Sequence, residues 1–341
     1  MKKKYNIPVI ILVFVSVLWL IAFPLFHEVF LSKLFYMPFV GAIAAIIANI
    51  TPAAAGIIYF PILTHLSIAP ITVCQFNLII QAYGMGLGTL RWFMFNRKLF
   101  ILNALPITIA GGFVGEIVSI VLFPIDNPEL LTLIFNFISF LFTQIIFISL
   151  LRNSRYPNVS IQLTLFNCTI MFIFAFIGGL MCGWIGFGID TIFYFLMTMM
   201  FRINPAASIV TSIALMAAMS ISGSVLNAIF HDIPLELWYS AIPGVTIGGL
   251  FLAAYIAVKM GSRNILLLFT FFLSVDFFVA LWTQQAIPIS ETVRKMLIYT
   301  LVFYMLFVHI KIFRNQSKNM NSSTGEFHVV EETENNERQY K

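Results

Sequence analysis

Two long apolar segments are each interrupted by residues that would stop a membrane helix in mid-span. Asn49-Ile50-Thr51-Pro52 breaks the 36–64 segment, and the turn Gly183–Gly188 breaks the 163–201 segment. If two half-helices begin at these breaks, their free N–H groups and positive dipole ends face the centre of the membrane. Such helix N-termini bind anions without a buried cation. The chemistry expected here is therefore the binding of a small anion between two breaks.

The local sequence of the first break predicts where its half-helix begins. Thr51 is a favoured N-cap residue and Pro52 suits the first helical position, so a helix is predicted from Pro52 to about Thr64. Residues 36–90 contain no Asp, Glu, Lys or Arg. An anion bound there would depend on backbone amides and neutral side chains. The alternative is that both breaks are only kinks packed against neighbouring helices.

Polar residues at the breaks and on the helices that follow would complete the site. The alternative for these side chains is hydrogen bonding between helices. The expected substrate-binding residues are Asn49, Thr51, Pro52, Gly56, Gln75, Asn77, Gln81, Gly186, Gly188, Asp190, Thr211 and Ser212.

Three acidic residues, Glu116, Asp190 and Asp276, fall at membrane depth, where an ionisable group is costly and is a functional candidate. Asp190 follows the glycine turn directly. If it is protonated, it could carry a coupling proton, whereas an ionised Asp190 would repel an anion. A neutral, hydrogen-bonded acid or a helix cap is the alternative.

The composition places this chemistry in a bilayer. The chain has 341 residues, of which 60% are hydrophobic and 10% charged. So few charges cannot cover a water-facing surface, which excludes a soluble enzyme and a nucleic-acid-binding protein. No cofactor or metal is expected, because Cys74, Cys168 and Cys182 lie in apolar runs without metal-ligand spacing. No nucleotide-binding motif is present, and the histidines are dispersed.

The loop charges predict the topology. Further apolar segments lie at about 8–26, 70–90, 101–123, 131–151, 205–230, 236–258, 264–283 and 294–313. The basic loops all fall on one side only if both broken segments are hairpins, so the positive-inside rule favours eight crossings and two hairpins. Both termini are then cytoplasmic in the cell (inner) membrane, and the first apolar segment is expected to stay as an uncleaved helix.

Matched spacings indicate an internal repeat. Tyr59-Phe60 and Pro70 match Tyr194-Phe195 and Pro205 at an offset of 135 residues. The expected fold is an all-α polytopic membrane protein with two inverted repeats, each a broken re-entrant helical hairpin plus three transmembrane helices, with an extra helix at each end. The expected divisions are a helix and loop at 1–35, repeats at 36–151 and 152–283, a helix at 284–314 and a disordered cytoplasmic tail at 315–341.

The second break and the helix after it resemble the sulfite exporter TauE/SafE family. The resemblance rests on the run Gly178–Asp190 with Pro205–Ser212, and on Thr51–Leu63 in the first copy, and it spans roughly residues 36–283. It implies a transporter of sulfite, sulfonates or related sulfur-containing anions. The first copy has Pro-Ala-Ala-Ala where the family usually has several glycines, and Phe76-Asn77 where the second copy has Thr211-Ser212. Because both departures fall at the expected site, the substrate could differ from sulfite.

The leading interpretation is a secondary transporter or permease, and not an enzyme. Its expected partners are a small anionic solute and the lipid bilayer, with no nucleic acid. An anion channel-like pore and an intramembrane enzyme are the alternatives. The substrate, the direction, the coupling ion and the oligomeric state stay open.

Overall fold

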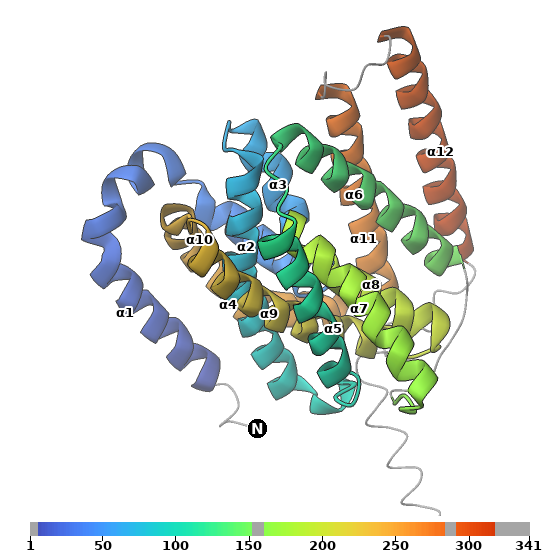
Figure 1. The fold of residues 1–341 in the computed structure, drawn as a ribbon, viewed down its shortest axis with the longest axis horizontal. Coiled ribbons are helices and arrows are strands. Elements are labelled where there is room, and N and C mark those ends of the chain that lie inside the picture. Colours follow the sequence, from blue (N-terminus) through green and yellow to red (C-terminus); the bar gives the residue numbers. More distant parts are fainter. Residues whose placement is uncertain (1–5, 152–159, 284–290, 318–341) are drawn as a thin grey trace, which may run out of the picture.

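The computed structural model describes residues 6–151, 160–283 and 291–317, and within these ranges every regular element is a helix (Figure 1). The predicted tail at 315–341 lies almost wholly outside the described residues. The α-helices are α1 (Asn6–Val29), α2 (Met37–Ala48), α3 (Gly56–His65), α4 (Pro70–Phe95), α5 (Leu105–Ile117), α6 (Pro128–Leu151), α7 (Leu165–Ile185), α8 (Ile189–Phe195), α9 (Pro205–Phe230), α10 (Leu235–Ile247), α11 (Ala253–Thr283) and α12 (Glu291–Ser317).

Short helical segments of other geometry extend or connect these helices. They are η2 (Phe30–Leu34), η4 (Val118–Leu122), η5 (Leu196–Met200) and η6 (Gly248–Leu252), which are π-helical, and η3 (Arg97–Leu99), which is a 3-10 helix. The break expected between the apolar segments 236–258 and 264–283 is present as a kink inside α11. Gly261 has a φ of 73° there, which lets the chain turn sharply without a longer connection.

Six helical stretches of the described residues are long and apolar enough to cross a membrane. They are Ile7–Leu34, Leu105–Leu122, Leu165–Ile185, Pro205–Phe230, Leu235–Gly261 and Glu291–Lys311. Shorter apolar helices occur at Met37–Ala48, Gly56–His65, Pro128–Gln144 and Ile189–Met200. α1 lies at the edge of the bundle and exposes large apolar side chains such as Ile21 and Leu25, which suits contact with lipid (Figure 1). The predicted all-α polytopic membrane fold is confirmed.

Each broken segment forms two separate helices in the structure, α2 and α3 in the first and α7 and α8 in the second. α8 runs back along α7, because a methyl group added at Gly178 of α7 would lie 2.8 Å from the Cα atom of Ile189 of α8. In the first segment the Tyr59 hydroxyl of α3 reaches back to within 3.4 Å of a methyl group added at Gly41 of α2. Each break therefore returns the chain toward the helix that precedes it.

Close helix pairs hold the two halves together. α4 and α9 pack extensively against each other, as do α5 and α7, and α2 and α10. A methyl group added at Gly111 of α5 would lie 2.5 Å from the Phe172 carbonyl oxygen of α7, and one at Gly248, directly after α10, would lie 2.6 Å from the Ala42 carbonyl oxygen of α2. Small residues let these backbones approach, as in other membrane helix pairs.

The order of the elements repeats along the chain. A broken pair, a long helix and a helix with a π-helical extension occur as α2, α3, α4 and α5–η4, and again as α7, α8, α9 and α10–η6. The last helix of each set packs on the first helix of the other set, because α5 packs on α7 and α10 packs on α2. The inverted orientation of the two copies in a bilayer, and the division at 151, stay predictions.

Candidate functional site

The first break is a non-helical stretch between α2 and α3 that is tied to neighbouring backbone. Asn49 Nδ2 donates to the carbonyl oxygens of Ala45 at 2.8 Å and Gly84 at 3.3 Å. Trp92 Nε1 in turn donates to the Asn49 carbonyl oxygen at 2.9 Å. Asn49 thus fixes the end of α2 against α4.

The predicted start of the first half-helix is wrong by four residues. α3 begins at Gly56 with Ala55 as its N-cap, and no side chain caps it. The Thr51 hydroxyl instead donates to the Ile47 carbonyl oxygen at 2.8 Å, so it satisfies the end of α2. This bond to the preceding turn competes with N-capping, as is common for Thr side chains.

The second break is a tight turn that depends on two glycines. Gly186 ends α7 with a φ of 76° and its N–H donates to the Cys182 carbonyl oxygen at 2.8 Å. Gly188 precedes α8 with a φ of 126°, a conformation that other residues rarely adopt. Between them Phe187 is fully buried.

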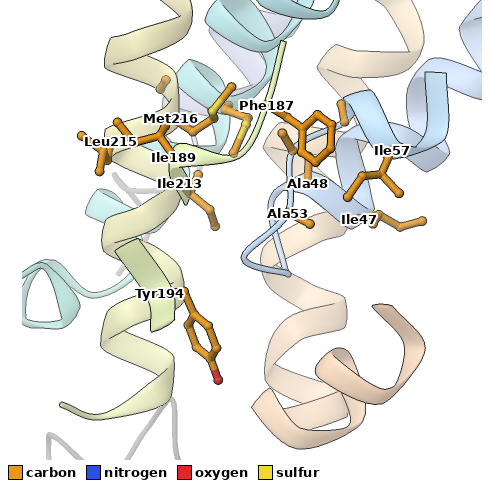
Figure 2. Close-up of a cluster of buried hydrophobic side chains, with 14 of the residues drawn as sticks. Ile47, Ala48, Ala53, Ile57, Phe187, Ile189, Tyr194, Ile213, Leu215 and Met216 are labelled. Atoms are coloured by element: carbon orange, nitrogen blue, oxygen red, sulfur yellow. The ribbon is translucent and has the colours of Figure 1, made fainter. Parts of the chain in front are cut away.

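The two breaks contact each other, and we call this contact the junction, made of Pro52, Gly56, Gly186, Phe187 and Thr191. Thr191 Oγ1 donates to the Pro52 carbonyl oxygen at 2.7 Å. A methyl group added at Gly56 would lie 3.6 Å from the Phe187 ring. Figure 2 shows Phe187 on the turn beside Ala48 and Ile57 of the first broken segment.

Two amide side chains of α4 lie at the junction. Asn77 lies between the breaks, because its Nδ2 atom would be 2.9 Å from a methyl group added at Gly56, and its Cβ atom 2.8 Å from one added at Gly186. Gln81, one turn further along α4, donates from Nε2 to the Gly186 carbonyl oxygen at 2.9 Å. Both side chains are buried.

Several polar atoms at the junction are buried without a hydrogen-bond partner. They are Asn77 Nδ2 and Oδ1 and Gln81 Oε1. Buried polar groups are normally paired, and an unpaired one destabilises the fold by about 1–3 kcal/mol. A small polar solute bound beside Asn77 would supply the missing partners.

Asp190 is buried in the first turn of α8. Its carboxylate lies against the backbone amides of Gly188 and Thr191, although neither oxygen reaches normal hydrogen-bond geometry. No lysine or arginine is buried among the residues whose burial the structure describes. The position suits a carboxyl that offsets the positive end of the α8 dipole. The side chain of Asp276 lies outside the described part of the chain.

Three other expected site residues lie away from the junction. The Thr211 hydroxyl donates to the Ala207 carbonyl oxygen at 2.8 Å and accepts from the Ile101 N–H at 2.9 Å, so it holds a connecting segment against α9. The Ser212 hydroxyl donates within α9 to the Ile209 carbonyl oxygen at 2.8 Å. Gln75 lines a separate cavity.

That cavity, which we call the vestibule, has a volume of about 60 Å³ and is open on one side. Its polar lining consists of Gln75, Ser119, Asp126, Trp184, Asn227 and His231, with Cys74 and Gly183 among the other lining residues. A buried water needs about 10–15 Å³, so the space suits several waters or a small solute. The Cys74 carbonyl oxygen lies 2.9 Å from a methyl group added at Gly186, so the vestibule borders the junction.

A second cavity of about 10 Å³ lies further along α4, between Asn49, Tyr59 and Gln81. α4 therefore passes the vestibule, the junction and this cavity in sequence.

Aromatic rings of α6 cover the junction. Phe135 stacks on Phe60 of α3 with ring centroids 3.9 Å apart and contacts Phe187 at 5.0 Å. Thr191, Phe187 and this aromatic cover were not among the expected site residues. Thr191 and Phe187 could have been found from the sequence, because they lie inside or next to the glycine turn, whereas Phe135 carries no local signal.

The fold and the junction define a multi-pass helical membrane protein in which two interrupted helices meet around buried amides. A family model described as Sulfite exporter TauE/SafE matches residues 37–283, which is more than half of the chain, and the chain belongs to this family. The family is one of membrane transporters, so the chain is a membrane transport protein. No curated protein and no solved structure was found to match it.

Proposed function

We propose that the chain is a secondary transporter or permease that carries a small sulfur-containing anion, of the sulfite or sulfonate type, through the junction. The observation that carries this proposal is Asn77. Its amide is fully buried between Gly56 and Gly186 and has no hydrogen-bond partner. An amide N–H and the start of α3 offer hydrogen-bond donors and a positive dipole end to an oxyanion, without a cation that would hold it too tightly.

The burial of the junction favours a transporter over an open channel. Asn77, Phe187 and Thr191 have no exposed surface, and none of them lines the vestibule or the second cavity. A solute could pass only if the breaks rearrange, which is the behaviour expected of broken helices in secondary transporters. With acidic loops outside, as the loop charges predict, the vestibule opens to the exterior of the cell membrane and both termini are cytoplasmic.

The test is a flux assay in proteoliposomes with sulfite, sulfate, thiosulfate and an alkanesulfonate. We expect at least one of these anions to move with saturating kinetics and to exchange against itself. Asn77→Ala is expected to lower that flux about tenfold or more, since a hydrogen bond to a charged group contributes about 1.5–3 kcal/mol.

Asn136→Ala serves as the matched control, because Asn136 is a buried amide of α6 that does not belong to the junction. Its flux should stay near that of the unaltered chain. Flux that never saturates would indicate the channel-like alternative. If no tested anion moves faster than in empty vesicles, the proposed substrate class is wrong.

A further inference from the structure

A second buried acid lies outside the junction. Glu116 of α5 has no exposed surface. Its Oε2 atom accepts a hydrogen bond from the Ser222 hydroxyl of α9, and its Oε1 atom has no hydrogen-bond partner. The titratable groups that face it from the other helices are Cys182 of α7 and, beyond Cys182, Asp190 of α8.

The surroundings of Glu116 favour a neutral carboxyl in this conformation. No cationic side chain of the described residues pairs with it. Removing a carboxylate from water without a cation costs far more than one hydroxyl hydrogen bond restores. The acid therefore holds a proton here and needs contact with water to release it.

The vestibule is the space from which that water would come, because two of its lining residues lie next to Glu116. A methyl group added at Gly223 of α9 would lie 3.2 Å from Glu116 Oε1 and 3.1 Å from the Leu78 side chain. Leu78 lines the vestibule, as does Ser119, one helical turn after Glu116. The Ser119 hydroxyl donates to the Glu116 carbonyl oxygen at 3.2 Å. Only one layer of side chains thus separates the carboxyl from the cavity.

The packing around Glu116 links it to the second break. Gly115 of α5 lies against the backbone of α7, where an added methyl group would be 2.2 Å from the Phe176 carbonyl oxygen. α7 ends at the turn that carries Gly186. A change of charge at Glu116 would therefore act on the helix that positions one side of the junction.

The predicted repeat has an acid at this position in one copy only. In the predicted repeat, Gly111-Gly112 also match Gly248-Gly249, at an offset of 137 residues, and at this offset the second copy has Ala253 in place of Glu116. A carboxyl that occurs in one copy alone is better explained by a function than by the architecture.

We propose that Glu116 is a proton-binding carboxyl that exchanges its proton with water in the vestibule and couples proton binding to anion movement. The coupling rests on the transport function proposed above, whereas the proton site itself does not. In the exchange step a hydronium ion in the vestibule gives its proton to the carboxylate, which becomes neutral, and leaves a water molecule.

The proton site is tested on the purified protein by infrared difference spectroscopy between acidic and alkaline buffer. We expect a carbonyl band of a protonated carboxylic acid that is lost at alkaline pH, is missing in Glu116→Gln and persists in the control Glu129→Gln, an exposed acid at the start of α6. An unchanged band in folded Glu116→Gln would overturn the proposal. If that variant does not fold, Ser222→Ala is the test. Removing the hydrogen bond from Ser222 should shift the pH midpoint at which the band is lost, and an unshifted midpoint would contradict the assignment of the band to Glu116.

Coupling is tested in proteoliposomes with an alkanesulfonate, whose charge does not change with pH, and a pH-sensitive dye inside. The unaltered chain should move protons with the anion and show a several-fold stimulation by a pH gradient. In Glu116→Gln the ratio of flux with and without the gradient should fall to about one. If the pH gradient still stimulates flux in Glu116→Gln, the proposed coupling is wrong. If the unaltered chain moves no anion at all, the transport proposal is wrong, and the infrared result alone then tests the proton site.

Discussion

Replacing Gly186 by alanine tests the geometry of the junction directly. Gly186 has a φ of 76°, and a side chain in this left-handed conformation costs about 1–2 kcal/mol. The added methyl group would lie 2.8 Å from Asn77 Cβ and 2.9 Å from the Cys74 carbonyl oxygen. Neither atom is at the end of a flexible chain, so α4 and the turn must move apart at a further cost of about 1–3 kcal/mol. The free energy of unfolding should therefore fall by about 2–5 kcal/mol.

The same displacement should lower transport. If Asn77 loses its hydrogen bond to the anion, the flux should fall about tenfold or more. Both quantities can be measured, the stability by an unfolding titration in mixed micelles and the flux in proteoliposomes with labelled anion.

Gly86→Ala is the matched control on α4, because a methyl group there has no neighbour within 4 Å. This control should keep the flux and raise the stability by about 0.5–1 kcal/mol, as expected when alanine replaces glycine inside a helix. The reasoning is refuted if Gly186→Ala unfolds at the same free energy as Gly86→Ala and transports the anion equally well.

Three further changes test other contacts. Thr191→Val removes the hydroxyl that joins the two breaks and should destabilise the protein by about 1–3 kcal/mol, while Thr191→Ser should keep most of that stability. Gly88→Ala would place a methyl group 1.6 Å from Asn49 Oδ1, so it should destabilise the protein by about 1–3 kcal/mol in an unfolding titration, and Asn49→Ala in the same chain should recover part of the loss. Single cysteines at Arg152 and Arg202 should both react with a membrane-impermeant reagent only from the cytoplasmic side, and labelling from opposite sides contradicts the hairpin topology.

The sequence allowed the breaks to be located because glycine and proline act locally. The turn at Gly186 and Gly188 lies where the pattern predicts it, since only glycine readily adopts these φ values. The predicted start of α3 was wrong because the Thr51 hydroxyl donates to a carbonyl oxygen of the preceding turn. Residue preferences for helix caps do not determine which of these two hydrogen bonds forms.

Contacts between segments that are distant in the sequence could not be predicted from the sequence pattern. Thr191 and the Pro52 carbonyl are 139 residues apart, and no local signal pairs them. The same holds for Thr211, which was expected at the site, whereas its hydroxyl accepts the Ile101 N–H from 110 residues away. Asn77 was expected too, but only the packing distinguishes it from Gln75, which lines the vestibule.

Phe135 gives the two half-helices a common bearing surface. It touches Phe60 on one side and Phe187 on the other, so neither break can shift far without sliding over the same ring. Ring contacts attract without fixing one direction, and they tolerate small translations that a hydrogen bond would resist. α6 therefore offers both broken segments one apolar surface along which small displacements cost little.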